Sequence, residues 1–258
     1  MTEPTPRVTA AMLAIGDELL SGRTKDRNIG HLAELLTAVG IELHEVRIVA
    51  DDQDAIVEAL NALRERYTYV FTSGGIGPTH DDITADAIAA AFGVPCRHDD
   101  KAMALLAKHY AGRGLEFTEA RQRMARMPVG ATHIDNPVSR APGFTVENVY
   151  VMAGVPSVFQ AMLDHVLPTL RTGAKLHSVS VSCQHGEGDI GGPLGEIQKE
   201  NPNVNIGSYP RYDGKRFSTE IVIRGRDEPA IEMARQAVVR MLDALDGAKA
   251  DPGADLQA

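Results

Sequence analysis

The 258-residue chain has few cysteines, a deficit of basic residues and no long apolar run. Its two cysteines, Cys96 and Cys183, lie in unlike contexts without metal-ligand spacing. We therefore expect reduced thiols, and neither a disulfide framework nor a cysteine metal site. No segment approaches ~18 consecutive apolar residues, and the N-terminus lacks a signal-peptide pattern. These absences predict a cytoplasmic protein that has no membrane as a partner.

Acidic residues outnumber basic ones by 35 to 26, which gives a formal net charge of −9. Such a balance provides no general attraction to nucleic acid or to anionic lipid, so neither is expected as a partner. A phosphate-bearing ligand would have to be attracted locally, by backbone dipoles, a few arginines or a metal ion. The apolar fraction of 43% is sufficient for a substantial core.

The stretch at residues 73–84, SGGIGPTHDDIT, follows a β-rich apolar run and precedes an alanine-rich segment that is typical of a helix. Its three glycines allow positive φ and close backbone approach, so that N–H groups can converge on phosphate oxygens. These glycines are Gly74, Gly75 and Gly77. Asp81 and Asp82 stand beside the expected helix start, and carboxylates suit a hard divalent cation. The stretch therefore indicates a phosphate and metal site; the alternative is a plain connection with Asp82 as the helix N-cap.

Apolar segments with strand and helix periods alternate through the first 92 residues. The expected strands cover residues 8–15, 41–49 and 69–72, and the expected helices cover residues 27–39, 51–63 and 83–92. This order predicts a parallel sheet with helices on both faces. Ligands of such sheets bind beyond the carboxyl ends of the strands. We therefore expect the loop at Gly16, Asp17 and Glu18 to lie at the same edge as residues 73–82.

The remainder predicts further helices at residues 99–110, 118–127 and 156–170, and a hairpin that turns at Glu147 and Asn148. Residues 172–246 follow the order β-α-β-β-α, with a glycine-rich turn at residues 186–192 and a last helix from residue 228. We expect domains at 1–171 and 172–246 and a disordered tail at 247–258. Because the second domain is small, a homo-oligomer is expected to stabilise it.

Four motifs occur together in a fixed order: GDELL at 16–20, SGGIGPTHDDIT at 73–84, APG at 141–143 and AGVP at 153–156. In this order the chain resembles the molybdopterin-binding (MoaB/MogA-like) domain family, and most closely the N-terminal part of competence/damage-inducible protein A, CinA. The resemblance implies a three-layer α/β/α domain with a mostly parallel sheet, followed by a small KH-like α+β domain. It also implies that the C-terminal amidohydrolase domain of full-length CinA proteins is missing here.

The resemblance assigns roles to individual positions. A divalent metal, Mg²⁺ or similar, and the catalytic function are assigned to three acids: Asp82, Asp81 and Asp26. Phosphate or nucleotide binding is assigned to Ser73, Gly74, Gly75, Gly77, Asp17, Glu18, Pro142, Gly143, Gly154 and Pro156. Plainer roles stay open for some of them: Asp26 as a helix N-cap, and Asp17 with Glu18 as acids of a helix start. His80 and Arg140 are each either a phosphate contact or an exposed loop residue.

The resemblance implies a divalent-metal-dependent pyrophosphatase that acts on ADP-ribose-like nucleotides. The alternative is a molybdopterin-binding protein without turnover, or an adenylyltransferase in molybdenum cofactor biosynthesis. The ligand is accordingly molybdopterin or an adenine nucleotide, and the partner is a small nucleotide or pterin phosphate. Residues at the phosphate edge would serve all three activities.

Overall fold

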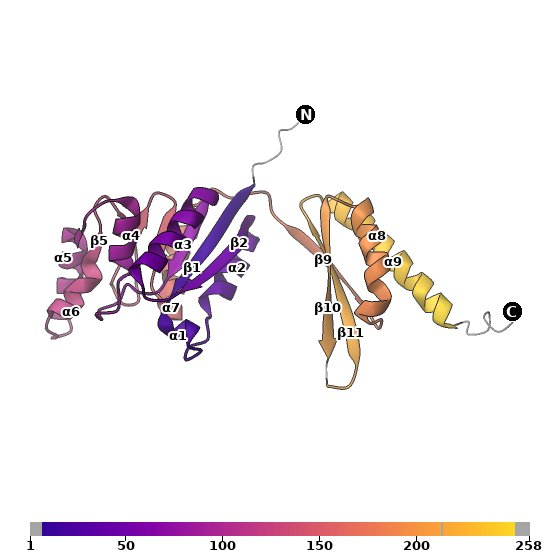
Figure 1. Cartoon of the computed structure of the whole chain (residues 1–258), viewed down its shortest axis with the longest axis horizontal. Coiled ribbons are helices and arrows are strands. Elements are labelled where there is room, and N and C mark those ends of the chain that lie inside the picture. The colour runs from indigo at the N-terminus through magenta and orange to yellow at the C-terminus, as the bar shows by residue number, and fades with distance from the viewer. Residues whose placement is uncertain (1–6, 213, 251–258) are drawn as a thin grey trace, which may run out of the picture. The chain divides into compact units, whose positions relative to one another are not determined.

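The computed structural model describes residues 7–212 and 214–250. The chain forms two compact units, of which the first ends at Ala174 and the second begins at Lys175 (Figure 1). The first unit contains a six-stranded sheet in the order β2-β1-β3-β8-β7-β6. Strands β2, β1, β3 and β8 are parallel to their neighbours in that series, whereas β7 is antiparallel to both β8 and β6. The predicted mostly parallel α/β/α domain is confirmed.

The strands of this sheet are β1 (Val8–Ile15), β2 (Ile41–Val49), β3 (Tyr69–Ser73), β6 (Thr132–Ile134), β7 (Gly143–Val146) and β8 (Val149–Met152). The helices of the unit are α1 (Asp17–Leu20), α2 (Asn28–Ala38), α3 (Gln53–Arg66), α4 (Thr84–Phe92), α5 (Asp100–Ala111), α6 (Glu119–Gln122) and α7 (Pro156–Val166). Two 3₁₀ helices, η1 (Arg123–Ala125) and η2 (Leu167–Thr169), follow α6 and α7. A separate two-stranded sheet pairs β4 (Cys96–His98) with β5 (Arg126–Pro128).

Strand β1 is apolar at every position except Thr9, because helices cover both faces of the sheet. Leu13 and Ile15 belong to the core cluster that α3, α4 and α5 complete. Met12 belongs to the opposite cluster, which is completed by α2 and α7. Successive side chains of a strand point to opposite faces, so this one strand supplies both cores.

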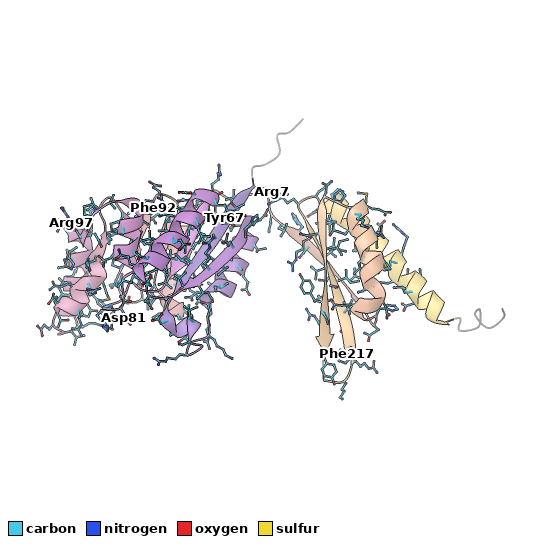
Figure 2. The ribbon with its side chains drawn as sticks, viewed as in Figure 1. Arg7, Tyr67, Asp81, Phe92, Arg97 and Phe217 are labelled. Carbon is cyan, nitrogen blue, oxygen red and sulfur yellow. The ribbon has the colours of Figure 1, made fainter. Side chains whose placement is uncertain are left out.

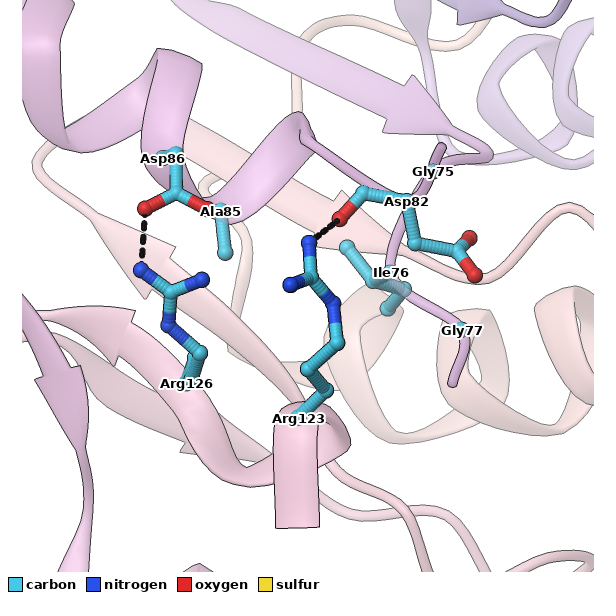
Figure 3. A pocket seen from close by; sticks show the side chains of 8 residues that line it. All are labelled: Gly75, Ile76, Gly77, Asp82, Ala85, Asp86, Arg123 and Arg126. Atoms are coloured by element: carbon cyan, nitrogen blue, oxygen red, sulfur yellow. Dashed lines mark hydrogen bonds and ion pairs between the residues drawn. The ribbon is translucent and has the colours of Figure 1, made fainter. Parts of the chain in front are cut away.

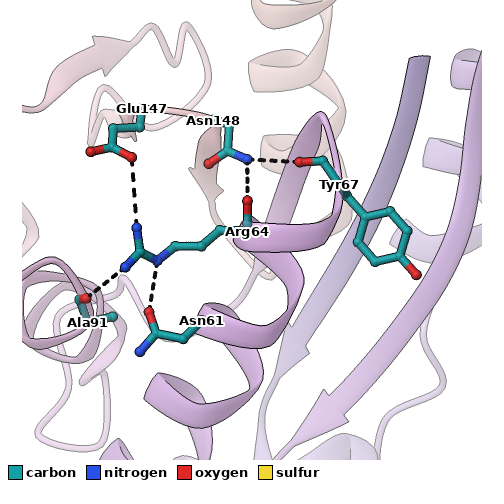
Figure 4. A network of polar contacts seen from close by, with 6 residues as sticks. All are labelled: Asn61, Arg64, Tyr67, Ala91, Glu147 and Asn148. Carbon is teal, nitrogen blue, oxygen red and sulfur yellow. Dashed lines mark hydrogen bonds and ion pairs between the residues drawn. The ribbon is translucent and has the colours of Figure 1, made fainter. Parts of the chain in front are cut away.

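A polar network holds the β7–β8 hairpin against the end of α3 (Figure 4). The Asn148 amide donates hydrogen bonds to the carbonyl oxygens of Arg64 (2.9 Å) and Tyr67 (3.0 Å). The last carbonyl groups of a helix have no partner within the helix, and here a side chain from the hairpin satisfies them. The Arg64 guanidinium in turn lies 4.3 Å from the centre of the Phe92 ring. The predicted turn at Glu147 and Asn148 is confirmed, with Glu147 at φ 50°.

The predicted helix at residues 118–127 is wrong over its second half. Helix α6 ends at Gln122, and the chain then passes through η1 into β5. In β5, Met127 pairs with Arg97 of β4, a strand that the sequence did not reveal. Buried Met127 packs into the same core as α4, so tertiary packing overrides the helical pattern.

The second unit has the predicted order β-α-β-β-α: β9 (His177–Cys183), α8 (Glu187–Glu200), β10 (Val204–Tyr212), β11 (Phe217–Gly225) and α9 (Glu228–Ala250). Its antiparallel sheet has the order β10-β11-β9. Phe217 lies at the hairpin end of β11 and is 73% exposed (Figure 2). The core contains Ile190 and Leu194 of α8 with Ile221 and Ile223 of β11.

Two predictions for this unit are wrong. Residues 187–192 form the first part of α8 instead of a turn, because Ile190 and Leu194, four residues apart, share the buried face of the helix. Helix α9 continues through Ala250, so residues 247–250 are helical, while residues 251–258 of the expected tail lie outside the described residues. Among the helices of the described chain, none has the length and apolarity needed to cross a bilayer.

Candidate phosphate site

The site lies where the connections of the main sheet change direction. Strand β1 has β2 on one side and β3 on the other, so the chain leaves β1 and β3 toward opposite sides. The carboxyl ends of such strands border a crevice, which is the usual ligand site of open α/β sheets. The loop after β1 and the loop after β3 therefore share this edge, as predicted.

The loop after β3 begins with two glycines that are packed tightly against other segments of the chain. Gly74 has φ 110°, and a Cβ atom there would lie 2.1 Å from the carbonyl oxygen of Ile15. Gly75 has φ 67°, and its Cβ would lie 2.1 Å from the hydroxyl oxygen of Thr84. Neither position accepts a side chain, because the first is closed by backbone and both have positive φ.

Buried Thr84 secures this turn, a role that sequence reasoning missed. Its hydroxyl donates to the Gly74 carbonyl oxygen and its backbone N–H donates to that of Gly75, both at 3.0 Å. The available signal was a hydroxyl residue at the first position of α4, two residues after the acidic pair. Thr84 thus connects the helix start to the glycine turn.

Three successive backbone N–H groups follow the turn, at Gly75, Ile76 and Gly77. Within the described chain none of them donates a hydrogen bond to a protein acceptor, whereas the N–H of Gly74 donates to Met152 O at 3.2 Å. All three residues are only half-buried. Backbone donors require a partner, and successive free N–H groups form an anion-binding concavity.

These donors border a small first cavity that is partly open to solvent (Figure 3). It is lined by Gly75, Ile76, Gly77, Asp82, Ala85, Asp86, Arg123 and Arg126. The Asp82 carboxylate lies against the backbone of Gly77, where a Cβ would approach it to 2.6 Å. One of its oxygens accepts the N–H of Thr79 at 2.7 Å. Arg126 forms an ion pair with Asp86.

A second cavity, of about 50 Å³ and also open to solvent, has Ser73, the residue before Gly74, in its wall. Ile15, Glu18, Leu19, Thr24, Lys25, Asp26, Arg27, Asn28, Gly154 and Pro156 complete the lining. Asn28 is 3% exposed, and its amide nitrogen donates to Ser73 Oγ (2.7 Å) and Gly154 O (2.8 Å). Sequence reasoning missed this residue, although an asparagine directly after Asp26 and Arg27 at the expected helix start was a signal. Asn28 joins three separate segments around the second cavity.

The predicted metal residues are not brought together. Asp82 lines the first cavity and Asp26 the second, while Asp81 lines neither and its side chain is 63% exposed. One Asp26 oxygen accepts the N–H of Ile29 at 2.8 Å, as a helix-capping residue does. Across residues 7–212 and 214–250, no three His, Cys, Asp or Glu side chains converge on a position suited to a metal ion. A centre shared by Asp82 and Asp26 therefore does not fit.

Carboxylates gather beside the crevice at the end of β2. The N–H of Asp17 donates to the Asp51 carboxylate at 3.0 Å. Burial raises the pKa of Asp51, and the negative charges of Asp17, Glu18 and Asp81 raise it further. Glu18 reaches the second cavity, whereas Asp17 lines neither cavity and stands in the first turn of α1.

The remaining predicted residues divide between structure and site. Gly154 and Pro156 line the second cavity. Pro142 and Gly143 are buried at the start of β7 and line neither cavity; a Cβ on Gly143 would lie 2.4 Å from Val151 O. The His80 side chain is 99% exposed, and Arg140 is an exposed loop residue at φ 66°.

Both cysteines are free. Burial raises the pKa of Cys96, near Asp86, to about 11. Its thiol therefore stays protonated at neutral pH and is a poor nucleophile.

Comparisons with known proteins match both units of the chain. The family described as probable molybdopterin binding domain matches residues 11–172, and the one described as FAD synthase, middle domain, matches residues 175–247. A solved structure of CinA from Thermoplasma acidophilum is 33% identical, with a TM-score of 0.59, and covers 63% of this chain and 98% of its own.

Full-length relatives extend the similarity into the second unit. A Pyrobaculum arsenaticum protein is 33% identical over 260 residues, which cover 96% of this chain and 97% of the relative. A probable FAD synthase of Caenorhabditis briggsae is 30% identical over 263 residues, which cover 93% of this chain. The matched region is 50% of that FAD synthase, so this chain spans about half of its length.

Proposed function

Because the chain belongs to the family of molybdopterin-binding domains, with a CinA-like first unit, we propose that it binds a phosphate-bearing nucleotide and hydrolyses its phosphoanhydride bond. ADP-ribose represents the proposed substrate class. Water adds across the P–O–P linkage, so that the products are AMP and ribose 5-phosphate.

One observation carries this proposal: the three successive N–H groups at residues 75–77 that lack a protein acceptor. They border the same cavity as the Asp82 carboxylate. Fixed donors stabilise negative charge that develops on phosphate oxygens without reorganising during the reaction. Donors that are half-buried and have no protein acceptor are available to a ligand in this cavity.

Each part of the edge has a role in this reaction. The N–H groups at residues 75–77 bind and orient the phosphoanhydride, and Asp82 orients the attacking water and accepts its proton. The second cavity holds the ribose or the base, with Asn28 fixing its walls. A divalent metal held by Asp82, when bound, would supply polarisation of the phosphate oxygens.

A molybdopterin-binding protein, or a molybdopterin adenylyltransferase, is the second candidate. It is favoured by the family match over residues 11–172. The same donors would hold a pterin phosphate, and the second cavity would hold the pterin ring. Tight pterin binding without hydrolysis supports a binding protein, and formation of adenylylated molybdopterin from ATP supports the transferase.

The test measures AMP release from ADP-ribose with Mg²⁺ or EDTA. Asp82→Asn should lower turnover by about 10²–10⁴-fold, because the position loses its charge and its proton acceptor. The matched control is Asp164→Asn, which neutralises an exposed acid of α7 that lines neither cavity. Unchanged turnover in Asp82→Asn, or no AMP release by the wild-type chain, contradicts the hydrolase proposal.

A further inference from the structure

Arg123 lies beside the glycine loop. It is the first residue after helix α6, where the chain leaves the predicted helix and forms η1 and then β5. It begins η1, and its guanidinium lines the first cavity beside Gly75, Ile76 and Gly77 (Figure 3). One nitrogen donates to the backbone oxygen of Asp82 at 3.2 Å. This contact connects two segments that are 41 residues apart in sequence.

The two arginines of this cavity differ in their partners. Arg126 is neutralised by the Asp86 carboxylate. Arg123 has no carboxylate within ion-pair distance in the part of the chain that is described, and its one hydrogen bond goes to a neutral carbonyl group. A guanidinium has five N–H donors, so most of those on Arg123 remain available to a ligand.

The charges of the cavity make this cation necessary for an anionic ligand. Asp82 and Asp86 both line the cavity, and only Asp86 is paired with an arginine. Without Arg123 the unpaired Asp82 charge would repel phosphate, in a chain whose net charge is already −9. A planar guanidinium binds two phosphate oxygens at once, and such charge-assisted pairs are strong.

We propose that Arg123 is the side chain that recognises the phosphoanhydride in the first cavity, where it complements the N–H groups at residues 75–77. The inference rests on the proposed function in so far as both place phosphate at this loop. The inference depends on binding and not on turnover, so it applies equally to a hydrolase and to a pterin phosphate carrier. Arg123 thereby favours phosphate-bearing ligands over uncharged nucleosides.

The test is calorimetric titration with inorganic pyrophosphate and with ADP-ribose, in EDTA so that no metal bridges the ligand. Arg123→Gln should weaken binding of both by about 10- to 100-fold. Arg123→Lys should recover part of the loss, because it restores the charge without the planar pair of donors. The control is Arg121→Gln, which removes an equal charge from α6 at a residue that stacks on Tyr110 and lines neither cavity.

Hydrogen exchange at residues 75–77 of the ligand-free variants separates recognition from a structural role. Unchanged exchange together with weaker pyrophosphate binding in Arg123→Gln supports recognition. The inference is overturned if Arg123→Gln binds pyrophosphate as tightly as wild type. It is also overturned if binding is weaker only in variants whose amide exchange at residues 75–77 is faster than in wild type. This test measures binding, and the AMP-release assay measures hydrolysis. If the chain binds pyrophosphate through Arg123 but releases no AMP, the hydrolase proposal fails and the inference about Arg123 stands.

Discussion

The loop at residues 74–77 and helix α8 each contain several glycines within a short stretch of chain. In the loop, a Cβ at Gly74 or Gly75 would lie 2.1 Å from an oxygen atom of another segment. In α8, a Cβ on any of the four glycines would meet no atom of a neighbouring segment within 4 Å; these are Gly188, Gly191, Gly192 and Gly195. Both stretches are rich in glycine, but of the two only the loop brings its glycines into close contact with other segments.

The difference also extends to hydrogen bonding. The loop leaves the N–H groups of Gly75, Ile76 and Gly77 without protein acceptors. Helix α8 runs from Glu187 to Glu200, so beyond the first turn its backbone N–H groups donate within the helix, except at Pro193, which has no N–H. A glycine-rich stretch becomes an anion site only where the backbone is held in a non-repetitive turn and its donors face a cavity.

The largest effect on stability is expected for Gly74→Ala. The new methyl group would meet the Ile15 carbonyl oxygen at a backbone position that cannot yield, and φ 110° strains any residue with a Cβ. We expect a loss of about 3 kcal/mol or more of unfolding free energy, measured by urea denaturation, with faster hydrogen exchange in β1 and β3. The control is Gly22→Ala, where φ is 71° but no atom lies within 4 Å, so that strain acts without a clash. Equal losses of unfolding free energy in the two variants would show that the clash with the Ile15 carbonyl oxygen does not contribute.

An intermediate effect is expected for Thr84→Val. This change removes the hydroxyl that donates to the buried Gly74 carbonyl oxygen and keeps the shape of the side chain. The acceptor would lose its partner, at a cost of about 1–3 kcal/mol in unfolding free energy. Thr84→Ser retains the hydroxyl and should stay closer to wild type. If Thr84→Val is as stable as Thr84→Ser, the hydroxyl does not secure the turn.

The smallest effect, and one of opposite sign, is expected for Gly195→Ala in α8. The position is exposed and helical, and the added methyl group meets nothing within 4 Å. Alanine should raise the unfolding free energy by about 0.5–1 kcal/mol through its helix propensity. A thermal melt of the whole chain should show a higher transition temperature for the second unit. A destabilised variant would mean that the glycines of α8 have a packing role after all.

Much of the first unit could be predicted from local patterns. The apolar run of β1 and the period of α2 reflect burial within single elements, which a short window of sequence records. The position of the glycine turn at the sheet edge followed from topology and is confirmed. The family resemblance is likewise confirmed over residues 11–172.

Errors and omissions occurred where distant segments meet. The segment at residues 123–127 has a helical pattern, yet its pairing with β4 makes part of it a strand. Asn28 acts on Gly154, which is 126 residues away, and Arg123 acts on the backbone at Asp82. No local window contains both members of such a pair, so their roles were not visible.

Local sequence patterns were enough to predict the alternation of strands and helices, the sheet edge that carries the loops, and the glycine turn. These features depend on backbone conformation and on the period of burial, both of which are local properties. The tertiary structure alone decided that Asp26 and Asp82 lie in different cavities, and that Arg123, instead of Arg140, stands at the loop. Which side chains come together depends on which distant segments of the chain lie side by side in the fold, and that is a property of the whole domain.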